Sequence, residues 1–222
     1  QRNAAGGICG GRTVEFVMED DKADPKEAAN VATKLVGDAS ILSVAHGWNS
    51  SAVLAAAPIF NEGGLSQVDY YGVAPAIREA GPWTFRVIPT GELMAKYLAK
   101  WVVADDGFKK VASFYENTDY GKGLFDVFAA EVQALGGEMV ASEAVLMDQK
   151  DFSAIIAKFK AAGPDAVVIF GQYEAAAFWA KQAPDVGLEA PLYGSDGIFA
   201  PELITLGGES VNGIRSVSAY TV

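Results

Sequence analysis

Residues 110–135, KVASFYENTDYGKGLFDVFAAEVQAL, decide the fold class. The apolar run Lys110–Tyr115 predicts a buried strand. Phe125, Phe128 and Val132 recur at three- and four-residue spacing, which predicts a helix with one buried face. The polar residues ENTDYG connect the two elements. A strand that leads directly into a helix is the repeating unit of parallel α/β sheets.

The same alternation continues in both directions along the chain. Asp24 is expected to cap a helix, with Pro25 at its first position and Glu27 completing a capping box. Further strands are predicted at Thr13–Glu19, Ile41–Ala45, Leu65–Tyr70, Thr84–Val87, Glu138–Val145, Asp165–Phe170, Pro191–Gly194 and Gly213–Ser218. Further helices are predicted at Ala52–Asn61, Leu93–Ala104, Phe152–Ala162, Ala175–Gln182 and Pro201–Leu206. This order predicts parallel sheets covered by helices on both faces.

The composition argues against several kinds of function and site. The 222 residues carry a formal net charge of −11, which argues against a nucleic-acid partner because phosphate binding needs clustered Lys and Arg. The chain has one cysteine, Cys9, and one histidine, His46, which is too few for a Cys/His zinc site. We expect His46 to have a structural role, and we expect neither a metal nor a cofactor. Apolar runs are too short to predict a direct membrane span.

Two further motifs are interpreted as structural. The glycine-rich segment 6–11 precedes a predicted strand, whereas a dinucleotide fingerprint follows a strand and opens a helix, so a turn is expected there. The acidic segment 19–24 lacks the spacing of a calcium loop and is interpreted as a solvated strand end followed by a helix cap.

Ligands of parallel sheets bind at the carboxyl ends of the strands, so the loops after the strands are the candidate site. Asn49 and Ser50 can either cap a helix or receive an anionic oxygen of a ligand. Tyr120, Tyr173 and Asp196 could each be structural, but their shared position in these loops favours a binding site. The loops are 46–51 (HGWNSS), 70–75 (YYGVAP), 116–121 (ENTDYG), 171–174 (GQYE) and 194–197 (GSDG).

Several motifs together resemble the substrate-binding proteins of branched-chain amino-acid-type ABC transporters, the Leu/Ile/Val-binding protein family. The resemblance covers nearly all of the chain. It implies a type I periplasmic binding protein fold, in which two flavodoxin-like (Rossmann-like) α/β lobes close on a small ligand. The motifs are Asn3-Ala4-Ala5-Gly6-Gly7, Glu19-Asp20-Asp21, Asp24-Pro25, Ala55-Ala56-Ala57-Pro58, Phe85-Arg86, Tyr120-Gly121, Asp151-Phe152-Ser153 and Gly194-Ser195-Asp196-Gly197.

The resemblance also implies a domain organisation. Residues 1–90 would form lobe 1, lacking its first strand and its C-terminal half, and residues 91–217 would form lobe 2. Residues 218–222 would begin the second crossing between the lobes. The chain is therefore expected to be an internal portion of a family chain. The resemblance also implies a location in the periplasm or, in a Gram-positive organism, at the cell surface as a lipoprotein.

By the same resemblance, the ligand carboxylate would be held by Asn49, Ser50 and the loop of Tyr71, Gly72 and Val73. Asp196 would hold the ligand amine, Tyr120 and Tyr173 would cover the ligand, and Trp48 would line its side-chain pocket. Three positions depart from the usual pattern: Asn49 replaces a hydroxyl residue, Val73 a threonine and Tyr71 a small residue. These departures argue against leucine, isoleucine or valine as the ligand. The four aromatic side chains could form the walls of a site for an aromatic acid, an amide or a cationic solute. The ligand classes expected are therefore an amino acid, an amide, an aromatic acid or a cationic solute.

The resemblance implies a non-enzymatic protein that delivers its ligand to an ABC permease. A ligand-sensing or receptor domain of the same fold, for an amide or an aromatic acid, remains an alternative. A third hypothesis is an α/β enzyme with Asp196 as general base; it is weaker because no nucleophile, metal cluster or nucleotide loop accompanies this acid.

Overall fold

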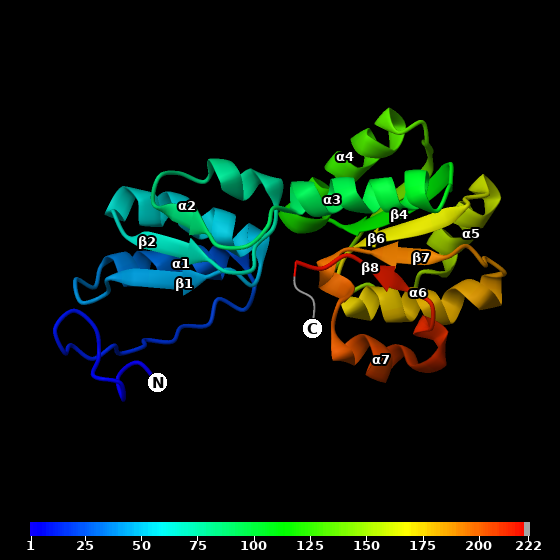
Figure 1. Cartoon of the computed structure of the whole chain (residues 1–222). Coiled ribbons are helices and arrows are strands. Elements are labelled where there is room, and N and C mark those ends of the chain that lie inside the picture. Colours follow the sequence, from blue (N-terminus) through cyan, green and yellow to red (C-terminus); the bar gives the residue numbers. More distant parts are fainter. Residues whose placement is uncertain (220–222) are drawn as a thin grey trace.

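The computed structural model describes residues 1–219, which form two α/β lobes joined by an extended segment (Figure 1). Lobe 1 contains a three-stranded parallel sheet of order β1-β2-β3. Its elements are α1 (Pro25–Val36), β1 (Ser43–His46), α2 (Ser50–Gly63), β2 (Ser66–Asp69), the 3₁₀ helix η1 (Pro75–Glu79) and β3 (Thr84–Arg86).

Lobe 2 contains a five-stranded parallel sheet of order β5-β4-β6-β7-β8. The strand order reverses between β4 and β6, and in open α/β sheets the carboxyl edge at such a reversal is the usual ligand site. The elements are α3 (Gly91–Lys100), the π-helical turn η2 (Trp101–Asp105), β4 (Lys110–Glu116), α4 (Asp119–Ala134), β5 (Glu138–Val145), α5 (Ser153–Ala162), β6 (Ala166–Phe170), α6 (Tyr173–Val186), β7 (Leu192–Gly194), η3 (Asp196–Ile198), α7 (Pro201–Gly207), η4 (Gly208–Val211) and β8 (Arg215–Ser216).

The lobe 2 sheet is buried on both faces. Successive residues of β6 alternate between two core clusters: Val168 packs with the residues of α3 and α4, and Val167 packs with those of α5 and α6. This alternation follows from the two-residue period of a strand. The predicted parallel sheet with helices on both faces is confirmed for this lobe.

The lobe 1 sheet is covered on one face within the described residues. Helices α1 and α2 pack together around a core of small side chains that includes Ala32, Ala56 and Phe60. On the opposite face Ala45 and Phe85 flank Val68 in one row across the sheet, and both flanking residues are exposed. Lobe 1 therefore holds the smaller core.

The predicted strand Thr13–Glu19 is wrong. Residues 13–19 are irregular. The Val14 N–H donates to the Asn3 side chain and the Val14 carbonyl accepts from it, both at 2.7 Å. In a sheet these two groups would bond a neighbouring strand instead. Phe16 and Met18 are 82% and 86% exposed. Alternating hydrophobicity predicts a strand only if a partner strand is available, and the described residues provide none.

The expected cap of α1 is only half present. Asp24 accepts the N–H groups of Lys26 and Glu27, as predicted. Its own N–H donates to the carbonyl of Asp21 at 2.9 Å, which takes the position expected for the Glu27 side chain in a capping box. The other predicted strands and helices are confirmed: Glu138–Val145 has the predicted ends, and the ends of the others are shifted. Of the crossing predicted at 218–222, residues 220–222 lie outside the described part of the chain.

Gly91 lies where the segment between the lobes enters α3. Its N–H donates to the carbonyl of Val73 at 2.8 Å. A Cβ atom on Gly91 would lie 2.5 Å from that lobe 1 oxygen and 2.6 Å from a methyl carbon of Leu124 in lobe 2. The junction therefore has no room for a side chain at this position.

We expect Gly91→Ala to lower the free energy of unfolding by about 1–3 kcal/mol, because backbone and core must shift to accept the methyl group. Thermal or urea denaturation measures the change. Gly37→Ala is the matched control, since Gly37 has φ −71° and only ordinary contacts, at 3.5 Å or more. Equal melting temperatures for the two variants would contradict the prediction.

We propose that residues 1–90 and 91–217 are separate units of unequal stability. Native-state hydrogen exchange on the 222-residue chain should show strong protection in β4 and β6, which are buried on both faces, and weak protection in β1 and β3. Equal protection in the two lobes would contradict the proposed boundary.

Candidate functional site

A cavity of about 260 Å³ lies between the lobes, at the carboxyl ends of the strands. Seven of the nine residues predicted for the site line it: Trp48, Asn49, Ser50, Tyr71, Tyr120, Tyr173 and Asp196. The other lining residues are Ala23, Glu116, Thr118, Met147, Gln172, Glu174 and Gly197. The cavity therefore takes residues from both lobes, including the loops after β4 and β6 at the reversal of strand order.

Asp196 is a buried acid directly after β7. It is 5% exposed, and the Tyr120 hydroxyl donates to its Oδ1 at 2.9 Å. Burial raises the pKa of Asp196 to about 6, while the hydrogen bond from Tyr120 acts in the opposite direction. Asp196 is therefore mostly ionised at pH 7.

Tyr120, in the first turn of α4, holds this acid in place. Its hydroxyl accepts the N–H of Gly197 at 3.0 Å and lies 2.7 Å from the Ser195 Oγ. Burial and the charge of Asp196 raise the pKa of Tyr120 well above its ordinary value, so the hydroxyl keeps its proton and can donate it. The main hydrogen bonds of Tyr120 are thus with the protein itself.

The lobe 1 wall is built on the N-terminus of α2. The Asn49 side chain accepts the N–H of Ala52 at 3.0 Å, so the predicted helix cap is confirmed, and the Ser50 hydroxyl accepts the N–H of Ala74 at 3.2 Å. The N–H groups of Ser50 and Ser51 precede the first intrahelical donors of the helix. Such a terminus attracts an anionic oxygen, for example a carboxylate.

Aromatic side chains complete the walls. Trp48 is 67% exposed and stacks on Tyr71, with ring centroids 5.0 Å apart and an interplanar angle of 15°. From lobe 2, Tyr173 hydrogen-bonds Glu174, which raises the pKa of the phenol. The stacked pair offers a flat apolar surface to a ligand side chain.

Two predicted site residues lie outside the cavity lining. The N–H of Gly72 donates to Asp69 Oδ1 at 2.6 Å, inside lobe 1. Val73 is buried in the core cluster that contains Leu98 and Leu124. The loop of residues 70–75 thus contributes Tyr71 to the cavity, while the next two residues pack behind it.

Glu116 is a lining residue that sequence reasoning missed. It ends β4, is 2% exposed, and its Oε1 accepts the N–H of Gln172 at 2.8 Å. Burial raises its pKa to about 7, and the charge of Glu174 adds to the rise. The sequence signal was an acid at the end of an otherwise apolar strand, in a loop already selected as a candidate.

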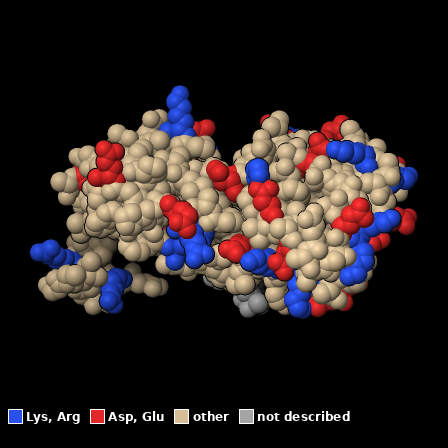
Figure 2. Space-filling model, turned by 90° about the horizontal axis from the view of Figure 1, so that it is seen from above, with Lys and Arg blue, Asp and Glu red and all other residues tan. Residues whose placement is uncertain are grey.

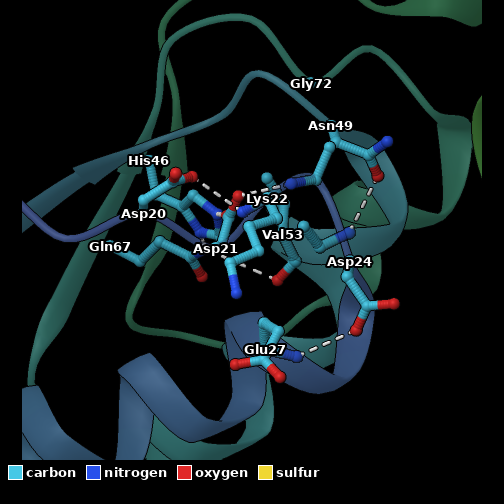
Figure 3. Close-up of polar contacts among 12 residues, drawn as sticks. Asp20, Asp21, Lys22, Asp24, Glu27, His46, Asn49, Val53, Gln67 and Gly72 are labelled. Atoms are coloured by element: carbon cyan, nitrogen blue, oxygen red, sulfur yellow. Dashed lines mark hydrogen bonds and ion pairs between the residues drawn. The ribbon is translucent and has the colours of Figure 1, made fainter.

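His46 has the structural role that we expected. Its Nε2 lies 2.7 Å from Asp21 Oδ2 and its Nδ1 lies 2.8 Å from the Gln67 amide, as Figure 3 shows. Asp21 also accepts the N–H of Ala23, a residue with φ 54° that lines the cavity. The histidine therefore supports the segment that borders the cavity.

A larger hollow of about 750 Å³ adjoins the cavity and shares four lining residues with it: Ala23, Asn49, Thr118 and Met147. Its lysine, Lys122, is paired with Asp126 one turn along α4. It contains neither buried acid, so the smaller cavity is the better candidate. On the face shown in Figure 2, acidic side chains lie along the waist between the lobes, with basic ones among them.

Residues 1–219 lack two kinds of feature, a metal-binding cluster and a membrane-spanning helix. This part of the chain contains no group of three or more His, Cys, Asp or Glu side chains that could hold a metal ion. It also contains no helix with both the length and the apolar character needed to cross a membrane.

The chain is similar to known binding proteins over its whole length. A family described as "Periplasmic binding protein" matches residues 1–222. The "Leu/Ile/Val-binding protein homolog 1" of Brucella abortus is 33% identical over 217 residues, which are 96% of this chain and 57% of that protein.

Solved structures extend the similarity. A branched-chain amino acid transporter substrate-binding protein from Streptococcus pneumoniae, in complex with isoleucine, has a TM-score of 0.89 and 28% identity, covering 99% of this chain and 63% of its own. A solute-binding protein of an ABC transporter from R. palustris, in complex with 4-hydroxybenzoate, has a TM-score of 0.82 and 25% identity, covering 93% and 57%. The chain thus spans less than two-thirds of each of these proteins.

Proposed function

Because the chain belongs to the periplasmic binding protein family, we propose that it captures a small zwitterionic solute, most plainly an amino acid, between its two lobes. The protein would work outside the cytoplasm and deliver the solute to an ABC permease. It would bind the solute without changing it chemically.

The observation that carries the proposal is the opposite polarity of the two cavity walls. Lobe 1 presents the N-terminus of α2 at Asn49 and Ser50, which suits a carboxylate. Lobe 2 presents the buried carboxyl group of Asp196, which suits an ammonium group. A ligand that carries both charges would bridge the lobes and stabilise their closure.

The aromatic residues suit the remainder of such a ligand. Trp48 and Tyr71 provide stacked apolar surface beside the carboxylate subsite. A cavity of about 260 Å³ is slightly smaller than the roughly 300–1,000 Å³ of drug-sized sites, which fits a small metabolite. The described lining residues include no Lys, Arg or His, so an aromatic acid would meet no positive side chain there.

A thermal-shift screen tests the proposal on the protein as its gene encodes it. The screen covers amino acids, aromatic acids and amides over a range of concentrations. A ligand that binds only the folded state stabilises it by RT ln(1 + [L]/Kd), so the melting temperature should rise with the concentration of a zwitterionic amino acid. Stabilisation by aromatic acids alone would contradict the proposal.

A further inference from the structure

The lobe 2 wall of the cavity carries more negative charge than one ammonium group needs. Glu116 and Glu174 line it together with Asp196. Glu116 and Asp196 are buried, and Glu174 is half-buried. Among the described residues, the ion pairs lie elsewhere, and none includes any of these three acids.

Glu116 is held in one position by its surroundings. Its carboxylate accepts the N–H of Gln172, the residue that precedes α6, at 2.8 Å. Gly171 allows this approach, since a Cβ atom there would lie 3.1 Å from the same carboxylate oxygen. The Gln172 side chain makes no capping bond to α6, so Glu116 fixes the loop that carries Tyr173 and Glu174.

A fixed, buried carboxylate without a counter-ion has an electrostatic consequence for the ligand. Burial of a negative charge is unfavourable unless a positive group compensates it. The neighbouring charge of Glu174 adds to the cost and, with burial, raises the pKa of Glu116 to about 7. A cationic group in the cavity would relieve this repulsion, whereas an anionic ligand would increase it.

We propose that Glu116 is a specificity-determining residue: it holds the loop after β6 and, with Glu174 and Asp196, favours a ligand bearing an ammonium group while rejecting a monoanion. The proposal rests on the proposed function of the same cavity. It assigns discrimination against aromatic carboxylates to a residue at the end of β4.

Two substitutions separate the charge of Glu116 from its hydrogen bond. Glu116→Gln removes the charge and keeps an acceptor for the Gln172 N–H, whereas Glu116→Ala removes both. Glu189→Gln is the matched control, because Glu189 is exposed, lies outside the cavity lining and changes the net charge equally.

The binding measurement uses isoleucine and 4-hydroxybenzoate as probes at pH 8, in the protein as its gene encodes it. We expect Glu116→Gln to weaken isoleucine binding about tenfold and to strengthen 4-hydroxybenzoate binding about tenfold, because a nearby negative charge has been removed. The Glu189→Gln protein should match the wild type for both probes.

The wild-type preference should also depend on pH. Glu116 is charged above pH 7 and increasingly neutral below it, so the preference for isoleucine should be weaker at pH 6 than at pH 8. Asp196, Glu174, Tyr120 and Tyr173 face the same cavity. Of these, Asp196 also titrates near pH 6, whereas the pKa values of both tyrosines are raised above their ordinary value. Glu116→Gln should remove the part of the pH dependence near 7 and leave the part near 6.

Hydrogen exchange gives a second readout that does not need a ligand. The Gln172 amide should lose protection in Glu116→Ala and keep it in Glu116→Gln. Unchanged protection in Glu116→Ala would overturn the positioning role, and an unchanged probe preference in Glu116→Gln would overturn the charge role. If neither probe nor any other amino acid binds the wild type, the proposed function fails together with this inference.

Discussion

Replacing Asp196 by Ala should weaken the binding of an amino-acid ligand by about 2–5 kcal/mol, because the substitution leaves a buried ammonium group without its counter-charge. Asp196 is 5% exposed, and the fixed Tyr120 hydroxyl orients it at 2.9 Å. A carboxylate that is already desolvated and oriented loses little freedom on binding a cation. Titration calorimetry with the ligand found in the screen measures the loss directly.

The isosteric variant separates charge from shape. Asp196→Asn keeps an acceptor for Tyr120, so it should fold like the wild type and still lose most of the affinity. Asp185→Asn on α6 is a matched control, because Asp185 is exposed and lies outside the cavity. Wild-type affinity in Asp196→Asn would mean that the ligand ammonium lies elsewhere or that the ligand has none.

The pKa of Asp196 adds a pH profile to this prediction. An ammonium ligand binds the ionised carboxylate, and the pKa in the free protein is about 6. Affinity should therefore be fully developed above pH 7 and should fall by about tenfold per pH unit once the pH is below 6. Asp196→Asn should lack this fall.

Sequence periodicity predicted lobe 2 well because helices cover both faces of its sheet, so its central strands are buried and apolar. Val167 and Val168 lie in a fully apolar run, and such a run between turn residues is typical of a buried parallel strand. The segment Thr13–Glu19 failed for the converse reason. Its alternation is compatible with a strand, but pairing depends on residues distant in sequence, and a local pattern does not contain that information.

The sequence predicted which loops form the candidate site, but it did not predict which side chains of those loops point into the cavity. Asn49, Tyr120 and Asp196 lie at the cavity because strand-exit loops of parallel sheets share one edge. Gly72 and Val73 occupy such a loop but face the interior, since the turn directs the Gly72 N–H to Asp69. A loop has no fixed period from which the direction of each side chain could be derived.

Replacing two tryptophans by Ala should affect different properties: Trp179→Ala should lower the stability of the fold, and Trp48→Ala should lower the affinity for the ligand. Trp179 on α6 is 2% exposed and packs on Phe114, with ring centroids 4.4 Å apart and an interplanar angle of 20°. Phe159 lies 5.5 Å away by the same measure. Trp179→Ala should therefore lower the free energy of unfolding by about 3–5 kcal/mol, through lost apolar burial and the cavity left in the core.

Trp48→Ala should leave the free energy of unfolding within about 0.5 kcal/mol of the wild type, because Trp48 is 67% exposed and borders the ligand cavity. The substitution should instead weaken ligand binding, because it removes the surface that Trp48 and Tyr71 form by stacking. We expect the binding free energy to fall by about 0.5–1.5 kcal/mol in addition to the effect of the lost apolar contact area. Urea denaturation and titration calorimetry on both variants measure the two effects. A large loss of stability in Trp48→Ala, or wild-type stability in Trp179→Ala, would contradict the assignment of one tryptophan to the site and the other to the core.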